Sequence, residues 1–280
     1  MKYADKVNDR LKKLLLVPKY KGLQKTAEAA AYSLNAGGKR LRPELCLEIC
    51  RIYGGDTQKA LDPACAIEMM HTFSLIHDDL PCMDDDDLRR GKPSCHKAFG
   101  ETAALLAGDL LAIYPFEIIA DCGFSAEQRI EMVESLSNAV GLYGMIGGQN
   151  ADTLSRPETV GELVGTYTMK TAALIRASCE IGCICAGAET KAAEEYGENL
   201  GIAFQIVDDI LDYTSDEKVL GKPVGSDKEK GKATVFSLCG LEGAKDLARE
   251  YTAKALEAAA KLPDNAYITE LTTKMLTRIN

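Results

Sequence analysis

Hydrophobic residues recur along this chain at intervals of three and four, which is helical spacing, and no segment alternates as a half-buried strand does. The pattern is clear in "AIEMMHTFSLIHDD" and "NLGIAFQIVDD". Residues that favour helix starts and stops separate such runs. These candidates are Ser125 with Gln128, Ser155 with Glu158, Pro43, Pro157, Gly54, Gly55, Gly123 and Gly187. We therefore predict an all-α protein of about ten or more helices.

Two stretches interrupt the helical pattern. Asp78 to Lys97 is rich in charge, and Tyr213 to Thr234 is polar and rich in Gly and Lys. The second is far longer than an ordinary connection between helices, and long loops in compact domains are often functional. We expect it to act as a lid.

Composition narrows the class of protein. The chain has 280 residues, 46% of them hydrophobic and 27% charged, so we predict one soluble domain over residues 1–280. No apolar signal core opens it and its longest uncharged run, Ser135 to Ala151, is short and polar, so we expect a cytoplasmic protein without stable membrane insertion. A net charge of −9 disfavours nucleic acid as a partner.

The ten cysteines form no C-x-x-C pair and lie mostly in apolar helical runs. We interpret them as small buried residues. Cys179 and Cys183 could share a metal ion by spacing, but no histidine is near them, which disfavours a metal site.

The acidic stretch "AFQIVDDILD" places Asp208 and Asp212 one turn apart on an apolar helix, about 40° apart around its axis. Two such carboxylates repel each other and are a defect unless a cation lies between them or they form a solvated helix end. Oxygen-only ligands of this kind suit Mg²⁺, which keeps positions for water and phosphate oxygens. The alternative of an EF-hand is disfavoured because its glycine and distal glutamate are missing.

A second acidic stretch, "SLIHDDLPCMDDDDLRRG", also ends an apolar helical run. On an unbroken helix Asp78 would share a face with Asp85, and Asp84 would lie elsewhere. Pro81 makes that count uncertain, because it cannot donate to the His77 carbonyl and must open the helix beside Asp78.

Basic residues complete the pattern. "AGGKRLRP" puts three cations, Lys39, Arg40 and Arg42, at the start of a helix, which is the electrostatically unfavourable end. A bound anion would remove the conflict, with Gly37 and Gly38 allowing close backbone approach; a solvated basic turn is the alternative. Further candidates are Arg89, Arg90, Lys170, Lys222 and Lys232. His71, taken alone, also fits a buried core histidine.

Together these motifs resemble a known family. "GGKRLRP", "SLIHDDLPCMDDDDLRRGKPSCHKAFG", "LLAGD", "GGQNAD", "MKTAALI", "AFQIVDDILD", "GKPVGSD" and "GKAT" occur in the order and spacing of the trans-isoprenyl diphosphate synthases across nearly the whole chain. The first motif, with two extra residues, is similar to that of the bacterial short-chain farnesyl diphosphate synthases.

The resemblance implies antiparallel helices around a deep apolar cavity, usually in a homodimer. It implies head-to-tail condensation: an allylic diphosphate, dimethylallyl or geranyl, ionises, isopentenyl diphosphate attacks the cation, and a proton is lost. It also implies three Mg²⁺ ions in each active site, with Mn²⁺ as the alternative ion.

Residue roles follow from the matching motifs. Asp78, Asp84 and Asp208 would ligate metal, supported by Asp79, Asp209 and Asp212. Gly38, Lys39, Arg42, His71 and Arg90 would bind isopentenyl diphosphate, and Arg89, Lys170, Gln205, Lys222 and Lys232 the allylic diphosphate. The Lys170 carbonyl and Thr171 hydroxyl would stabilise the carbocation. The family pattern thus pairs Asp78 with Asp84 rather than with Asp85.

Phe73 and Ser74 would set product length. Phe73 lies five residues, about 7.5 Å, before Asp78, where a bulky aromatic in the family closes the cavity and limits the product to fifteen carbons. Ordinary core packing is the alternative role for Phe73. Twenty- and ten-carbon products remain alternatives. A terpene cyclase is more remote, because it would lack the GKR block, and a non-catalytic subunit would be expected to lose Asp208 or Lys170.

Overall fold

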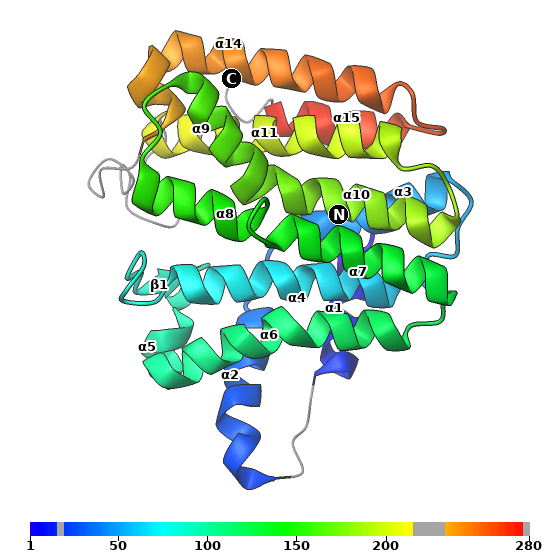
Figure 1. Cartoon of the computed structure of the whole chain (residues 1–280), viewed down its shortest axis with the longest axis vertical. Helices are drawn as coiled ribbons and strands as arrows, with labels where there is room; N and C mark the ends of the chain where they lie inside the picture. Colours follow the sequence, from blue (N-terminus) through cyan, green and yellow to red (C-terminus); the bar gives the residue numbers. More distant parts are fainter. Residues whose placement is uncertain (16–19, 215–232, 277–280) are drawn as a thin grey trace. The chain divides into compact units, whose positions relative to one another are not determined.

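The computed structural model describes residues 1–15, 20–214 and 233–276. Most of these residues are helical, and the one sheet among them is a hairpin of two-residue strands, β1 (Leu88–Arg89) and β2 (Lys92–Pro93), which pair antiparallel (Figure 1). The all-α prediction is confirmed, although this hairpin was not anticipated. The α-helices are α1 (Ala4–Leu14), α2 (Gln24–Leu34), α3 (Leu41–Ile52), α4 (Leu61–Asp78), α5 (Cys95–Phe99), α6 (Glu101–Asp121), α7 (Ala126–Val140), α8 (Met145–Asn150), α9 (Val160–Tyr167), α10 (Ala173–Ala186), α11 (Lys191–Thr214), α14 (Val235–Ala259) and α15 (Ala266–Leu276). Shorter segments are a 3₁₀ turn, η1 (Lys21–Leu23), and two π-helical segments, η2 (Ala151–Ser155) and η3 (Thr168–Ala172).

The chain divides into two compact units. Unit 1 comprises Met1–Leu47 and Thr57–Val133, and unit 2 comprises Glu48–Asp56 and Glu134–Asn280. A single domain over residues 1–280 stays a prediction.

In unit 1, α4 packs against α6, α1 and α2, and α6 also contacts α2 and α5. The middle of α4 is apolar on nearly all sides, and Ile67, Met69 and Met70 are fully buried. Glu68 and Thr72 are buried on the same helix, so α4 carries polar groups into an apolar core.

In unit 2, α11 packs against α10, α14 and η3 (Figure 1). Leu163, Tyr167, Ile206, Ile210 and Val235 belong to its buried core. Close packing needs glycine here: a Cβ on Gly197 would lie 2.7 Å from the Arg176 Cα, and one on Gly201 would overlap the Ala172 Cα. Glycine spacing therefore sets how closely α11 approaches η3 and α10.

Most predicted helix boundaries are confirmed. Ser125 and Gln128 bond reciprocally ahead of α7, and Gly187 ends α10 with a left-handed φ of 67°. The prediction at Ser155 was wrong. That residue belongs to η2, and Thr159 with Glu162 forms the capping box of α9, because the helix starts only after Pro157 and two more residues.

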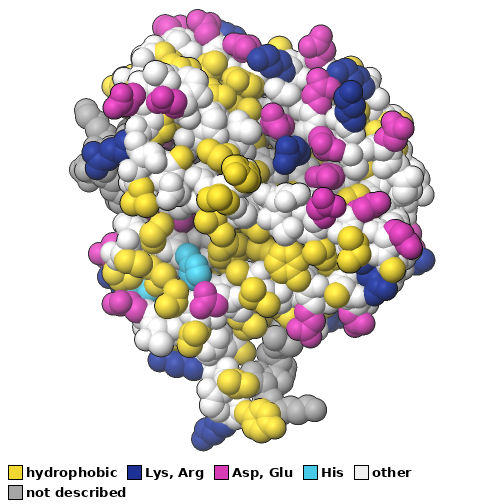
Figure 2. Space-filling model, in the orientation of Figure 1, with side chains coloured by type: hydrophobic (Ala, Val, Ile, Leu, Met, Phe, Trp, Pro, Cys, Tyr) yellow, Lys and Arg dark blue, Asp and Glu magenta, His cyan; other side chains and the backbone are white. Residues whose placement is uncertain are grey.

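The helix α6 is long and apolar enough to cross a membrane by length and composition, and 44% of the relevant window is buried within the protein. Its exposed apolar side chains are Leu105, Leu106 and Ile113. Figure 2 shows apolar side chains gathered over the part of the surface where α6 lies in Figure 1.

The cysteine prediction is confirmed in substance. All ten cysteines are free, and eight are buried; Cys82 is exposed and Cys239 is partly exposed. Burial raises the pKa of Cys183 to about 12, which keeps that thiol protonated and unreactive.

Candidate functional site

The first acidic motif forms a tight turn directly after α4. The helix ends at Asp78, and the Asp84 N–H donates to the Asp78 carbonyl at 2.8 Å. A second bond of 2.8 Å runs from the Met83 N–H to the Leu80 carbonyl, and Pro81 lies inside the loop that these bonds close. The predicted break beside Asp78 is confirmed, and the turn brings the backbones of Asp78 and Asp84 together despite five intervening residues.

The neighbouring Asp85 faces the other way. Its φ is 51°, and its carboxylate lies 3.6 Å from His96 Nε2 and 3.9 Å from Lys97 Nζ, both on α5. Lys97 also pairs with Asp87 at 2.7 Å. Asp85 and Asp87 therefore interact with basic groups of α5, whereas Asp86 lies 3.3 Å from Arg89.

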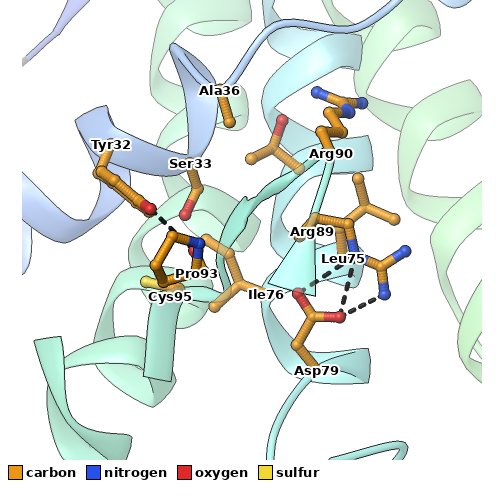
Figure 3. Close-up of a pocket in the computed structure, with 11 residues that line it drawn as sticks. Tyr32, Ser33, Ala36, Leu75, Ile76, Asp79, Arg89, Arg90, Pro93 and Cys95 are labelled. Atoms are coloured by element: carbon orange, nitrogen blue, oxygen red, sulfur yellow. Dashed lines mark hydrogen bonds and ion pairs between the residues drawn. The ribbon is translucent and has the colours of Figure 1, made fainter. Parts of the chain in front are cut away.

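Asp79 holds Arg89 (Figure 3). Asp79 is 2% exposed, and both its oxygens accept from Arg89, whose Nε lies 2.9 Å from Oδ1. Burial raises the pKa of Asp79, and Arg89 opposes the shift. Because Arg89 lies on β1, this pair ties the hairpin to the end of α4.

Arg89 and Arg90 line a pocket with α2 and α4 residues, including Tyr32 and Leu75 (Figure 3). The Arg90 guanidinium donates to the Gly37 carbonyl. It also lies close to Gly38: a Cβ added to that glycine would be only 2.6 Å from the Arg90 Cζ. Gly38 also has a φ of 124°, so any other residue would be strained there and would collide with Arg90. The GGKR loop and the RR pair are thus brought together as predicted.

His71 and Arg42 belong to the same basic cluster. Burial holds the pKa of His71 well below its usual range, and the positive charges of Arg42, Arg90 and Arg40 lower it further. Burial, with help from Arg90, lowers the pKa of Arg42 to about 10. The Arg42 Nε is buried without a hydrogen-bond partner among the described residues. Such a concentration of positive charge is suited to a polyanion.

Arg40 anchors the Gly37–Gly38 loop to buried groups of unit 1. It is buried, donates to Glu68 at 2.7 Å, to the Leu34 carbonyl at 2.6 Å and to Asn8 at 2.9 Å, and has a φ of 53°. A non-glycine residue in this conformation is strained, and these three bonds explain how the chain maintains it.

In unit 2, the "MKT" block lies in the π-helical segment η3, a form often found at functional sites. Lys170 Nζ pairs with Asp152 at 2.6 Å. A Cβ on Gly148 would overlap the Lys170 backbone nitrogen, so α8 approaches η3 closely only because that residue is glycine.

Thr171, Gln205 and Asp209 form a connected hydrogen-bond chain. Thr171 Oγ1 donates to Gln205 Oε1 at 2.8 Å, and Gln205 Nε2 donates to Asp209 Oδ1 at 3.0 Å. Asp209 Oδ2 accepts from the Tyr167 hydroxyl and, at 3.3 Å, from the Val235 N–H.

The three acids of the second motif differ in exposure. Asp208 is half-buried, whereas Asp209 and Asp212 are each 7% exposed. Within residues 1–15, 20–214 and 233–276, no group of three or more His, Cys, Asp or Glu side chains could enclose a metal ion alone. A site with only one or two carboxylate ligands fits Mg²⁺, whose other coordination positions are filled by water and phosphate oxygens.

Lys222 and Lys232, with most of the expected lid, lie outside the described residues. Conversely, sequence reasoning did not single out Asp152, Tyr167 or Glu68. Asp152 could have been found because it closes the "GGQNAD" block. Nothing in the local sequence marks Tyr167, whose partner Asp209 lies 42 residues away.

Comparisons with known proteins indicate the same family as the sequence motifs. The polyprenyl synthetase family model matches residues 23–271. The chain is 45% identical to the farnesyl diphosphate synthase of Geobacillus stearothermophilus over 258 residues, covering 89% of this chain and 86% of that protein. It is 46% identical to the chloroplastic geranylgeranyl pyrophosphate synthase 11 of Arabidopsis thaliana over 241 residues, covering 82% of this chain and 68% of that one.

Solved structures agree. An apo structure of an FPP/GFPP synthase from Zymomonas mobilis has a TM-score of 0.87 and 34% identity, covering 98% of this chain and 96% of that one. A geranyltransferase from Helicobacter pylori complexed with magnesium and isoprenyl diphosphate has a TM-score of 0.83 and 31% identity, covering 99% and 94%. With the matching motifs and family model, these likenesses show that the chain belongs to the polyprenyl synthetase family.

Proposed function

We propose that this protein is a Mg²⁺-dependent trans-prenyltransferase that condenses dimethylallyl or geranyl diphosphate head-to-tail with isopentenyl diphosphate and releases diphosphate. The observation that carries this is the arrangement along α4. One helix presents His71 to the basic cluster with Arg42 and Arg90, and ends at Asp78 beside Asp84. One helix thus contributes a residue both to a site for a polyanion and to a carboxylate pair for a hard cation.

Isopentenyl diphosphate is assigned to Gly38, Lys39, Arg42, His71 and Arg90. The Gly37–Gly38 loop and Arg90 support this, because they place backbone and guanidinium groups together next to the half-buried Arg42. A neutral His71 can accept or donate a hydrogen bond without adding another charge to three arginines.

The allylic diphosphate is assigned to Arg89, Lys170, Gln205, Lys222 and Lys232. Arg89 is preoriented by Asp79, and Lys170 by Asp152. We assign metal binding to Asp78, Asp84 and Asp208, with Asp79, Asp209 and Asp212 in supporting roles, and we propose three Mg²⁺ ions per site, with Mn²⁺ as a substitute. Asp84 is favoured over Asp85 because its backbone bonds to Asp78, whereas the Asp85 carboxylate interacts with His96 and Lys97.

When bound, Mg²⁺ would neutralise the negative charge that grows on the departing diphosphate. The cationic side chains of the protein do the same, and they are most effective where water is excluded. The Lys170 carbonyl and the Thr171 hydroxyl would then stabilise the allylic cation, and the departing diphosphate can accept the proton.

We propose farnesyl diphosphate as the main product. Phe73 is 8% exposed and packs edge-on against His77 with ring centroids 5.7 Å apart, so its ring is held in one place below Asp78. With Ser74 it would limit chain growth. Geranylgeranyl diphosphate, with geranyl diphosphate after it, is the alternative; a terpene cyclase does not explain the basic cluster at Gly38, and a non-catalytic subunit does not explain Lys170 and Asp208.

We further propose that both units form one synthase domain and that the protein is a cytoplasmic homodimer. The exposed apolar residues Leu105, Leu106 and Ile113 on α6 support a second copy as their cover. Light scattering of the purified protein tests this, because a monomer would exclude it.

The central test uses purified protein with isopentenyl and dimethylallyl diphosphates. We expect condensation that requires Mg²⁺ and a fifteen-carbon main product by mass spectrometry. Addition of EDTA should abolish turnover, and excess Mg²⁺ should restore it. Absence of Mg²⁺-dependent condensation would refute the proposed function, and a longer main product would refute only the product assignment.

A further inference from the structure

The hydrogen-bond chain in unit 2 has a defined polarity. A carboxylate can only accept hydrogen bonds, so the Gln205 side chain must turn its NH₂ group towards Asp209. The Gln205 carbonyl then faces Thr171, and the Thr171 hydroxyl must donate to it. The only hydrogen of this hydroxyl is used in that bond, and its lone pairs remain for another partner.

The other side of Asp209 fixes the start of the chain. Its Oδ2 accepts from the Tyr167 hydroxyl and from the backbone N–H of Val235. Val235 is the first residue of α14. Burial and the adjacent Asp209 raise the pKa of Tyr167 far above its usual range, so Tyr167 remains a donor. At least three donors of the described residues converge on this buried carboxylate, which is the arrangement expected for a permanent acceptor.

We propose that Asp209 and Gln205 are positioning residues: they hold the Thr171 hydroxyl with its lone pairs, not its hydrogen, available to the allylic cation. Asp209 thereby contributes to catalysis through Gln205 rather than as a metal ligand. The inference rests on the proposed role of Thr171. With the chain reversed, the positive end of the hydroxyl dipole would face a developing positive charge and would raise the barrier.

The substitution Asp209→Asn should reverse the chain. The Val235 N–H can only donate and therefore requires an oxygen at its side, where the Tyr167 hydroxyl can also keep donating, so the introduced NH₂ group must face Gln205. Gln205 would then turn its carbonyl towards the new amide and its NH₂ group towards Thr171. The Thr171 hydroxyl would become an acceptor, with its hydrogen directed away from Gln205.

The test is a double-mutant cycle in steady-state kinetics. Asp209→Asn should lower kcat about tenfold or more, while KM for both substrates stays within about threefold, because an interaction made in the transition state is lost. In a Thr171→Val background, where there is no hydroxyl to orient, the loss of kcat caused by the same substitution should be at least about fivefold smaller, and the loss that remains measures the supporting role of Asp209 at the metal. Equal losses in the two backgrounds would overturn the inference.

Tyr167→Phe is the matched control. It removes a donor to the other carboxylate oxygen and leaves the bond to Gln205, so thermal stability should fall while kcat stays within about threefold. The Gln205 side-chain amide, followed by NMR in protein labelled with ¹⁵N-glutamine, should shift in Asp209→Asn and little in Tyr167→Phe. A loss of kcat in Tyr167→Phe as large as in Asp209→Asn would contradict the relay.

If Asp209→Asn does not fold by circular dichroism, Gln205→Met decides the question. It removes the acceptor of Thr171. Because Gln205 is also assigned to the allylic diphosphate, KM for that substrate should rise in both backgrounds, whereas kcat should fall at least about fivefold more with the Thr171 hydroxyl than in Thr171→Val. Equal losses of kcat in the two backgrounds would overturn the inference. Failure of the proposed function has a different signature, because the unsubstituted protein would then not condense the two substrates at all.

Discussion

Glu68→Gln is the substitution from which we expect the clearest loss of stability in unit 1. Glu68 and Arg40 are each 2% exposed and lie 2.7 Å apart, so the neutral amide leaves the Arg40 guanidinium buried without its counter-charge. Removing one partner of a buried ion pair typically costs about 3–5 kcal/mol. Arg42 and Arg90 also lose a favourable interaction with Glu68, which adds to the repulsion within the basic cluster.

Thermal unfolding followed by far-UV circular dichroism measures the effect. At about 2–4 °C per kcal/mol for a protein of this size, the midpoint should fall by roughly 6–20 °C. Asp9→Asn is the matched control, because Asp9 pairs with Lys12 at 3.8 Å on the exposed face of α1 and should matter by less than about 1 kcal/mol.

A double substitution separates the loss of the pair from loss of space filling. Arg40→Met with Glu68→Met replaces both charges by apolar groups. This double variant should recover at least half of the decrease in unfolding midpoint that Glu68→Gln causes, because no unpaired charge remains. If Glu68→Gln shifted the midpoint no more than Asp9→Asn, the pair would not stabilise unit 1, and our explanation of how Arg40 keeps its positive φ would be wrong.

Three further predictions concern the site. Phe73→Ala should shift the product distribution towards longer chains by mass spectrometry, and an unchanged distribution would show that Phe73 only packs in the core. Asp84→Asn should raise the Mg²⁺ concentration needed for half-maximal rate at least about tenfold, whereas Asp85→Asn should change it less than about threefold; the reverse order would assign the metal to Asp85. The pKa of His71 is lower in the folded protein than in the unfolded chain, so below about pH 6.5 the unfolded chain binds a proton that the folded protein does not. As the pH decreases from that value, the free energy of unfolding should therefore decrease by up to about 1.4 kcal/mol per pH unit. His71→Gln should flatten that part of a urea-denaturation profile against pH, and an equally steep profile would refute the assignment.

The helical class and much of the site could be predicted because their signals are local. Period-3.6 spacing shows where apolar faces lie, and Gly187 and Ser125 mark helix ends through their own backbone preferences. The break beside Asp78 follows from the missing N–H of Pro81. The prediction failed at Ser155, because the capping spacing recurs at Thr159 and only the π-helical segment η2 decides between them.

Residue identity alone could not assign the acids their separate tasks. In sequence, Asp78, Asp79, Asp84 and Asp85 are equivalent carboxylates; in the folded protein Asp79 binds Arg89, and Asp85 faces His96 and Lys97. In the second motif, Asp209 is bonded to Tyr167, Gln205 and Val235. These partners depend on which segments the core brings together, and they lie ten or more residues away in all but one case.

The sequence by itself therefore determined the helical fold class, the family and the residue types available for a Mg²⁺-dependent diphosphate reaction. These depend on local periodicity and on motifs that can be read without knowing any long-range contact. Only the tertiary structure decided that Arg40 is a buried support of the basic loop, that glycines at 148 and 201 admit η3, and that Asp209 orients Gln205 and Thr171. Each of these depends on packing between distant segments, and the hydrogen-bonding direction of a side chain is set by the partner that packing supplies.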